Sequence, residues 1–83
     1  MNDYRPISCR QYAELERAIL QQAWLRVAWA VPGERRRLQS LRPLDLRTRE
    51  HAEYLFALNL CGDELEIRLD HIHRFMPLAA AGG

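Results

Sequence analysis

The chain has 83 residues, a mass of 9.8 kDa and a formal net charge of +1, with 48% hydrophobic and 28% charged residues. A chain this short buries only about 60–65% of its unfolded surface, which leaves room for one domain and no deep catalytic cleft. The hydrophobic share is too high for a disordered segment, no apolar run approaches the roughly 18 residues of a membrane span, and the polar start contains no secretory signal. We therefore expect one soluble cytoplasmic domain in which Cys9 and Cys61 are reduced thiols.

The basic residues are all arginine, and they are concentrated in the middle of the sequence. Positions 26–49 carry seven arginines against two acids, whereas positions 50–83 carry two arginines against six acids. This asymmetry can steer a charged partner toward one part of the surface. A mixed, solvated surface accounts for the same pattern equally well.

The first predicted element is a helix over residues 9–22. Ser8 and Gln11 have the spacing of a capping box, and Ile7 and Tyr12 have the spacing of a hydrophobic staple. An apolar stripe then follows at helical intervals along one face. Its members are Tyr12, Leu15, Ala18 and Ile19. Charged side chains occupy the other face, so the helix is expected to pack through the stripe and expose its acids.

The next segments alternate with a period of two, which predicts strands. Residues 24–31 form the first strand, with the odd-numbered residues from Leu25 on one face. A Pro-Gly turn leads to a second strand over residues 35–41, which Pro43 is expected to end. Residues 44–52 are expected to form a polar connection with at most a short strand.

The clearest predicted hairpin has its turn at Gly62. The even-numbered residues from Tyr54 to Leu60 are expected to face inward in its first strand, and the odd-numbered residues 65–69 in its second. A last strand covers residues 72–76. One helix followed by four or five short antiparallel strands predicts an α+β unit bent into a small barrel, with the helix covering one open end.

We expect a single domain over residues 1–76 and a flexible C-terminal tail over residues 77–83. The strand edges are flanked by Arg and Glu, which discourages pairing between copies and favours a monomer.

The sequence contains no motif that supports catalysis or cofactor binding. Phosphate-binding loops, nucleophile elbows and zinc-protease motifs are all absent. His71, His73 and Cys61 do not have the spacing of a metal site, and solvated histidines are the simpler interpretation. We therefore expect no enzymatic activity, no metal, no cofactor and no small-molecule substrate.

The arginines between Arg35 and Arg49 are the feature most typical of nucleic-acid binding. Clustered cations contact phosphates, and an aromatic side chain such as Trp24 can stack on a base. The isoelectric point of about 7.9 is nevertheless well below that of a dedicated nucleic-acid binder. An RNA-binding module that uses Arg35–Arg49 is therefore kept as the alternative function.

Several segments together resemble a known family. The opening YRPISCRQYAELERA, residues 4–18, is similar to that of the Rho-binding antiterminators, the Rof or YaeO family. The resemblance resumes at residues 45–46 and 53–55, and it is clearest at EIRLDHI, residues 66–72, followed by Phe75. It covers nearly the whole chain to about residue 76.

The resemblance implies both a fold and a function. The implied fold is an N-terminal helix packed on a small five-stranded antiparallel Sm-like β-barrel. The implied function is that of a protein inhibitor that binds the RNA-binding domain in each subunit of the transcription termination factor Rho. Such a protein obstructs the primary RNA site and so reduces Rho-dependent termination. It is expected neither to bind RNA itself nor to associate with a membrane.

The resemblance also implies where the contact surface lies. In the family it includes the first helix and the loop before the Glu-Tyr-Leu strand. The helical wheel of this sequence adds Glu14. The helix here holds Arg10, Gln11 and Ala13 where the family is richer in Asp, so steric blocking carries more of the effect. For Tyr12, core packing and a contact role are both left open. The expected partner-binding residues are Tyr12, Glu14, Glu16, Arg49, Glu50 and His51.

Overall fold

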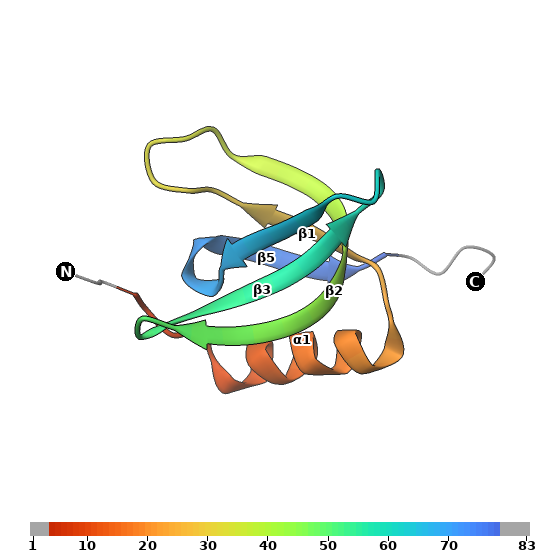
Figure 1. Cartoon of the computed structure of the whole chain (residues 1–83), viewed down its shortest axis with the longest axis horizontal. Helices are drawn as coiled ribbons and strands as arrows, with labels where there is room; N and C mark the ends of the chain where they lie inside the picture. Colours follow the sequence, from red (N-terminus) through yellow and green to blue (C-terminus); the bar gives the residue numbers. More distant parts are fainter. Residues whose placement is uncertain (1–3, 79–83) are drawn as a thin grey trace.

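The computed structural model describes residues 4–78, which form one helix and one five-stranded antiparallel sheet (Figure 1). The elements are α1 (Cys9–Gln21), β1 (Leu25–Trp29), β2 (Arg37–Arg49), β3 (Ala52–Asn59), β4 (Glu64–Arg68), the 3₁₀ turn η1 (Leu69–His71) and β5 (Ile72–Pro77). The strand order is β4-β3-β2-β1-β5, and all four neighbouring pairs are antiparallel. The predicted α+β class with one helix and an antiparallel sheet is confirmed. Within residues 4–78 the outer strands β4 and β5 do not pair, so the sheet is open.

Helix α1 begins and ends through specific capping interactions. The Ser8 hydroxyl accepts a hydrogen bond from the Gln11 amide at 3.1 Å, and the Gln11 side chain accepts one from the Ser8 amide at 3.4 Å. The helix ends at Gln21, because Gln22 takes a left-handed conformation with φ 53°. Leu15 and Ala18 are buried beneath the sheet, and α1 runs along β2 in Figure 1. The predicted capping box and apolar stripe are confirmed.

The core is centred on β1 and its neighbours. Leu25, Val27 and Trp29 are at most 4% exposed, so the predicted inward face of this strand is confirmed, although Ala28 on the other face is buried as well. The strand is shorter than predicted, because β1 ends at Trp29 and Val31 is 38% exposed in the loop that follows. These side chains pack with Leu15 from α1 and place the helix firmly against the sheet.

Strand β2 continues without interruption past Pro43, where the sequence predicted a break. The prediction was wrong, since the expected polar connection over residues 44–52 is mostly the second half of β2. Leu41 pairs with β1 on one side and with β3 on the other, and β1 contributes no partner beyond this point. The register shifts between Pro43 and Asp45, and a strand tolerates proline at such a bulge because the missing N–H removes no regular ladder bond. One long strand therefore joins both halves of the sheet.

The inward face of β3 is the opposite of the predicted one. Leu55 and Ala57 are fully buried, whereas Tyr54 and Phe56 lie half-buried on the outer face. The outer aromatics are covered by arginines from β2: the Arg47 guanidinium lies 3.8 Å from the centre of the Phe56 ring. The prediction placed the larger side chains inside, but cation–π stacking gives them a partner outside.

The C-terminal strands follow the prediction more closely. Ile67 and Leu69 are buried as expected. Strand β5 includes Pro77, which the prediction assigned to the tail, and the Leu78 amide donates a hydrogen bond to the Trp24 carbonyl at 3.1 Å. The sheet therefore extends past residue 76, and residues 79–83 of the predicted tail lie outside the described residues.

Candidate interaction surface

Tyr12 lies at the edge of the core, close to carboxylates from three elements. It packs against the buried cluster, so the core role predicted from the apolar stripe is confirmed. Burial raises the pKa of its hydroxyl, and the charges of Glu53, Glu16 and Asp45 raise it further. These acids belong to β3, α1 and β2. We call Tyr12, Glu16, Asp45 and Glu53 the acidic surface.

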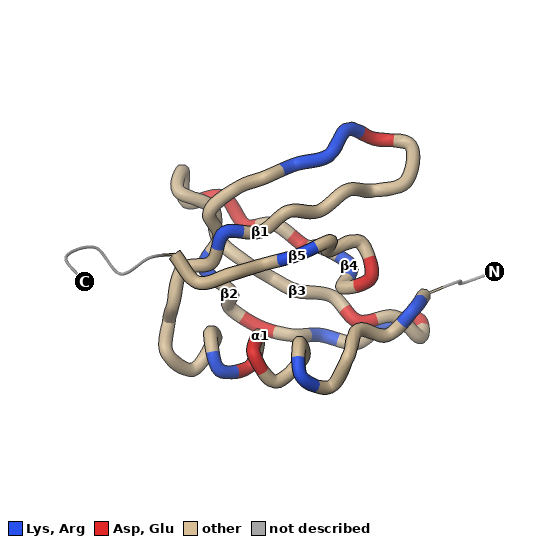
Figure 2. Tube along the Cα trace, turned by 180° about the vertical axis from the view of Figure 1, so that it is seen from behind, with Lys and Arg blue, Asp and Glu red and all other residues tan. Residues whose placement is uncertain are grey.

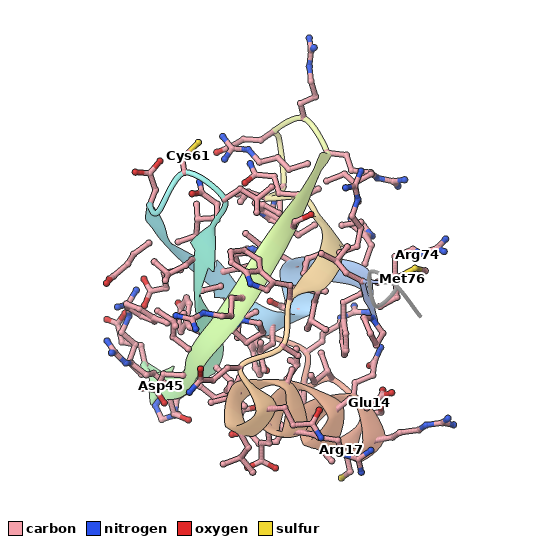
Figure 3. All side chains as sticks on the ribbon, turned by 90° about the vertical axis from the view of Figure 1, so that its right-hand side faces the viewer. Glu14, Arg17, Asp45, Cys61, Arg74 and Met76 are labelled. Atoms are coloured by element: carbon pink, nitrogen blue, oxygen red, sulfur yellow. The ribbon has the colours of Figure 1, made fainter. Side chains whose placement is uncertain are left out.

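The structure separates the two predicted acids of α1. Both are exposed, but residues two positions apart on a helix point about 200° apart. Glu16 lies on the flank of Tyr12, whereas Glu14 lines a shallow hollow of about 160 Å³ beside Phe75 and Pro77. Figure 3 places Glu14 toward β5 and Asp45 on the other side of the molecule. The predicted residues Glu14 and Glu16 therefore do not form one surface.

The turn between β2 and β3 carries the other predicted contact residues. Glu50 and His51 are exposed and have φ values of 51° and 65°, as in the tight two-residue turns of type I′. Non-glycine residues adopt this left-handed region at a cost of about 1 kcal/mol each. The turn lies at the same end of the molecule as the start of α1 (Figure 1). It therefore projects beside the acidic surface.

Arg49 is drawn back from the turn onto the outer face of the sheet. Its guanidinium donates to Glu66 at 2.7 Å and lies 4.5 Å from the centre of the Tyr54 ring. The bond to Glu66 raises the pKa of Arg49, and desolvation acts in the opposite direction. Of the predicted turn residues, Arg49 is thus committed to contacts within the sheet, whereas Glu50 and His51 are presented outward at the tip.

The arginines of the alternative RNA-binding segment do not form one surface. Arg47 donates to Asp45 at 2.9 Å, and this hydrogen bond lowers the pKa of the Asp45 carboxyl. Arg49 is bonded to Glu66. Arg35 and Arg36 instead lie in the loop between β1 and β2, which projects at the other end of β2. The continuous cationic segment of the sequence is therefore divided by its folding.

The lead-in to α1 is tied to η1 through Asp70, which also forms a bidentate ion pair with Arg68. Arg68 donates to Asp70 at 2.6 and 2.8 Å, and the Arg5 amide donates to the same carboxylate at 3.2 Å. The Tyr4 hydroxyl donates to Glu53 at 3.1 Å. Burial would raise the pKa of Asp70, but the hydrogen bonds from Arg68 and Arg5 lower it below its usual value. The Arg68–Asp70 pair therefore joins β4 to η1, and its carboxylate anchors the lead-in.

Two members of the acidic surface, Asp45 and Glu53, were missed as site residues. The available signal was their occurrence in the segments that carry the family resemblance. Their proximity to Tyr12 depends on β2 continuing past Pro43, which brings Asp45 beside the helix. A sequence interpretation that ended the strand at Pro43 had no means of placing it there.

The described residues contain no group of three or more potential metal ligands among His, Cys, Asp and Glu. Cys9 and Cys61 are both exposed thiols. Between residues 4 and 78, no helix has the length and apolar character needed to cross a membrane.

Comparison with known proteins shows a similarity of fold. No family model and no curated protein matches the chain. Among solved structures, the chain is similar to the proteasome accessory factor B/C (PafBC) of Arthrobacter aurescens, with a TM-score of 0.73 and 19% identity. The match covers 90% of this chain and 12% of that chain, so this chain spans a small part of that protein's length. At this identity the likeness concerns the small α+β fold alone.

Proposed function

We propose that the chain is a cytoplasmic, non-enzymatic inhibitor of the transcription termination factor Rho, and so an antiterminator. In this proposal it binds the N-terminal RNA-binding domain of subunits of the Rho hexamer as a monomer and blocks primary-site RNA binding. The proposal starts from the family resemblance of residues 4–18 and 66–72. It requires no cofactor, metal or small-molecule substrate.

The observation that carries the proposal is the exposed position of Glu16 on the flank of Tyr12, with Asp45 and Glu53 near enough for their charges to act on the same hydroxyl. Glu16, Asp45 and Glu53 come from different elements, and their charges all act on one hydroxyl. A single-strand RNA site is cationic and lined with aromatic side chains, because it must hold phosphates and bases. The exposed Glu16 and Asp45, the half-buried Glu53 and a tyrosine at their edge are complementary to such a site, although Asp45 is already paired with Arg47.

The proposed fold is a helix packed on an Sm-like barrel. The order β4-β3-β2-β1-β5 supports this proposal, because the two outer strands are β4 and β5 and the long β2 takes part in both halves of the sheet. In the inhibitory complex the acidic surface would occupy the positively charged part of the RNA site on Rho. The sheet behind it would exclude RNA by its bulk.

The test is competition between the chain and a labelled RNA on purified Rho. Gel filtration of the Rho hexamer with a fluorescent C-rich RNA should show the chain co-eluting with Rho while the RNA is displaced. Glu16→Arg places a cation against a cationic site and should weaken displacement about tenfold or more. Glu14→Arg is the matched control, because it makes the same charge change on the opposite flank of α1 and should alter displacement less than about twofold.

Two results would contradict the proposal. One is the absence of co-elution with Rho for a chain that is folded by circular dichroism. The other is direct RNA binding by the isolated chain with an affinity that falls steeply with salt, which would favour the alternative RNA-binding module. Equal losses of RNA displacement for Glu16→Arg and Glu14→Arg would instead show that the acidic surface is not the contact site.

A further inference from the structure

A second surface lies on the outer face of the sheet, over β1, β5 and the start of β2. It is a groove of about 330 Å³. We call it the arginine groove, with rim residues Arg26, Arg36 and Arg74 and floor residues Ala28, Leu38 and Met76. The strand pairing explains this composition, since Ala28 lies between Leu38 and Arg74, and Arg26 pairs with Met76.

The floor of the arginine groove exposes aliphatic side chains. Leu38 is 56% exposed and Met76 is 46% exposed, although both occupy strands. Figure 3 shows Met76 beside Arg74 at the margin of the molecule, away from the helix. Large apolar side chains that are exposed together and rimmed by cations are typical of an interaction site.

The rim arginines are not neutralised by the protein itself. Among residues 4–78, no acidic side chain forms an ion pair with Arg26, Arg36 or Arg74. By contrast, Arg47 and Arg49 are each paired with a carboxylate at 2.9 Å or less. Basic positions in the loop before β2, in β1 and in β5 are marked in Figure 2. The groove therefore offers unneutralised positive charge around an apolar floor.

The groove also borders an open strand edge. Strand β5 is the last in the sheet and pairs only with β1 within the described residues. An exposed edge presents unpaired backbone groups that an extended chain can use, while alternate side chains of that chain enter neighbouring hollows. Arg74 and Met76 lie on this edge strand and also line the groove. The edge and the groove thus form one continuous surface.

We propose that the arginine groove binds an extended acidic segment of a partner protein, in which carboxylates alternate with aliphatic side chains. The carboxylates would pair with the rim arginines, and the aliphatic side chains would pack on Leu38 and Met76. A single-stranded nucleic acid fits less well, because its bases need stacking rings. The aromatic side chain that reaches the groove is Phe75, which is half-buried and packs against the core. This inference is independent of the proposed binding to Rho.

The test uses a fluorescein-labelled peptide in which Glu and Leu alternate, titrated with the full chain and followed by anisotropy. A peptide with Gln in place of Glu reports the charge contribution, and an oligocytidine RNA of similar length represents the nucleic-acid outcome. The Glu-Leu peptide should bind at least about tenfold more tightly than the other two probes. Its affinity should fall as salt is raised, because charge pairing contributes to it.

Variants locate the binding on the groove. Arg26→Gln with Arg74→Gln should weaken peptide binding about tenfold, and Leu38→Ser should weaken it severalfold. Arg10→Gln with Arg17→Gln is the matched control, since it removes two exposed arginines from α1 and should leave the affinity within about twofold. Arg74→Lys keeps the charge and should retain most of the binding.

The proposal is overturned by any of three results. These are no binding of the Glu-Leu peptide at the highest soluble protein concentration, equal losses in the groove and α1 variants, or tighter binding of the RNA with the same sensitivity to groove variants. Circular dichroism of each variant establishes that a loss of binding is not a loss of folding.

Discussion

The acidic surface and the arginine groove carry opposite charge but are built in different ways. The acidic surface gathers side chains from α1, β2 and β3 around Tyr12, whose ring is part of the packed core. The arginine groove arises mainly from strand alternation, because neighbouring outward positions of β1, β2 and β5 are Arg or aliphatic, and the β1–β2 loop adds Arg36. The first region depends on tertiary packing, whereas the second depends on the register of the sheet.

This difference separates stability from binding. A formal net charge of +1 gives no sign of two oppositely charged regions on one small chain. Substitution of Tyr12 in the acidic surface should disturb the core as well as a partner, because Tyr12 packs on the core. Substitutions in the groove should affect a partner while leaving the free energy of unfolding nearly unchanged.

The largest expected effect is at Tyr12. Tyr12→Ala removes a half-buried ring and should lower the free energy of unfolding by about 2–3 kcal/mol, as measured by urea denaturation. Tyr12→Phe keeps the ring and should change it by less than about 0.5 kcal/mol. Leu38→Ala in the groove is the comparison, with an expected loss below about 1 kcal/mol because that side chain is 56% exposed. Equal losses at Tyr12 and Leu38 would remove the distinction between the two regions.

An intermediate effect is expected at Asp70, which anchors the lead-in to α1. Asp70→Asn should cost about 1–2 kcal/mol, since it leaves the partly buried Arg68 without its carboxylate. Burial opposes ionisation of Asp70, but hydrogen bonds from Arg68 and Arg5 give a net lowering of its pKa in the folded chain. Its stabilisation is therefore present above the ordinary value of 3.8 and is lost as pH falls through the lower folded value.

Urea denaturation across the acid range checks this assignment. The wild-type chain should lose stability below the ordinary Asp pKa more steeply than the Asn variant. Parallel pH profiles for the two proteins would contradict it.

The smallest expected effect is a gain of stability in the β2–β3 turn. His51→Gly should raise the free energy of unfolding by about 0.5–1 kcal/mol, because glycine adopts the positive φ of 65° without steric cost. Thermal melts should show a higher midpoint. If His51 also contacts Rho, as the family resemblance implies, the same variant should bind Rho more weakly although it is more stable. A lower midpoint would show that the side chain has a stabilising contact that outweighs its backbone cost.

The sequence predicted local structure well where a pattern had a single solution. Ser8 and Gln11 specified the start of α1, and the alternation from Leu25 specified the buried face of β1. The inward face of β3 was predicted wrongly, because Tyr54 and Phe56 are larger than Leu55 and Ala57 and were therefore assigned to the core. Their stacking partners, Arg47 and Arg49, lie in the adjacent strand β2, in the segment that was predicted to be a polar connection.

The candidate surface was only partly predictable for a related reason. The exposure of Glu16 follows from the helical wheel, and so does its separation from Glu14, although both were assigned to one surface. The contribution of Asp45 depends on a strand that continues through Pro43. Likewise, Arg26 and Arg74 meet only because β5 returns beside β1, and that pairing spans most of the chain. Such long-range contacts have no local signal.

The buried position of Trp29 in β1 has a practical consequence. The two tryptophans of the chain, Trp24 and Trp29, both lie on the β1 side of the sheet, and the Trp24 carbonyl is bonded to the end of β5. Trp24, beside the end of β5, is therefore an intrinsic optical reporter for peptide docking along β5, whereas the core-facing Trp29 reports on folding. A ligand bound at the acidic surface would leave the tryptophan emission largely unchanged. The unlabelled chain can therefore distinguish binding at the arginine groove from binding at the acidic surface.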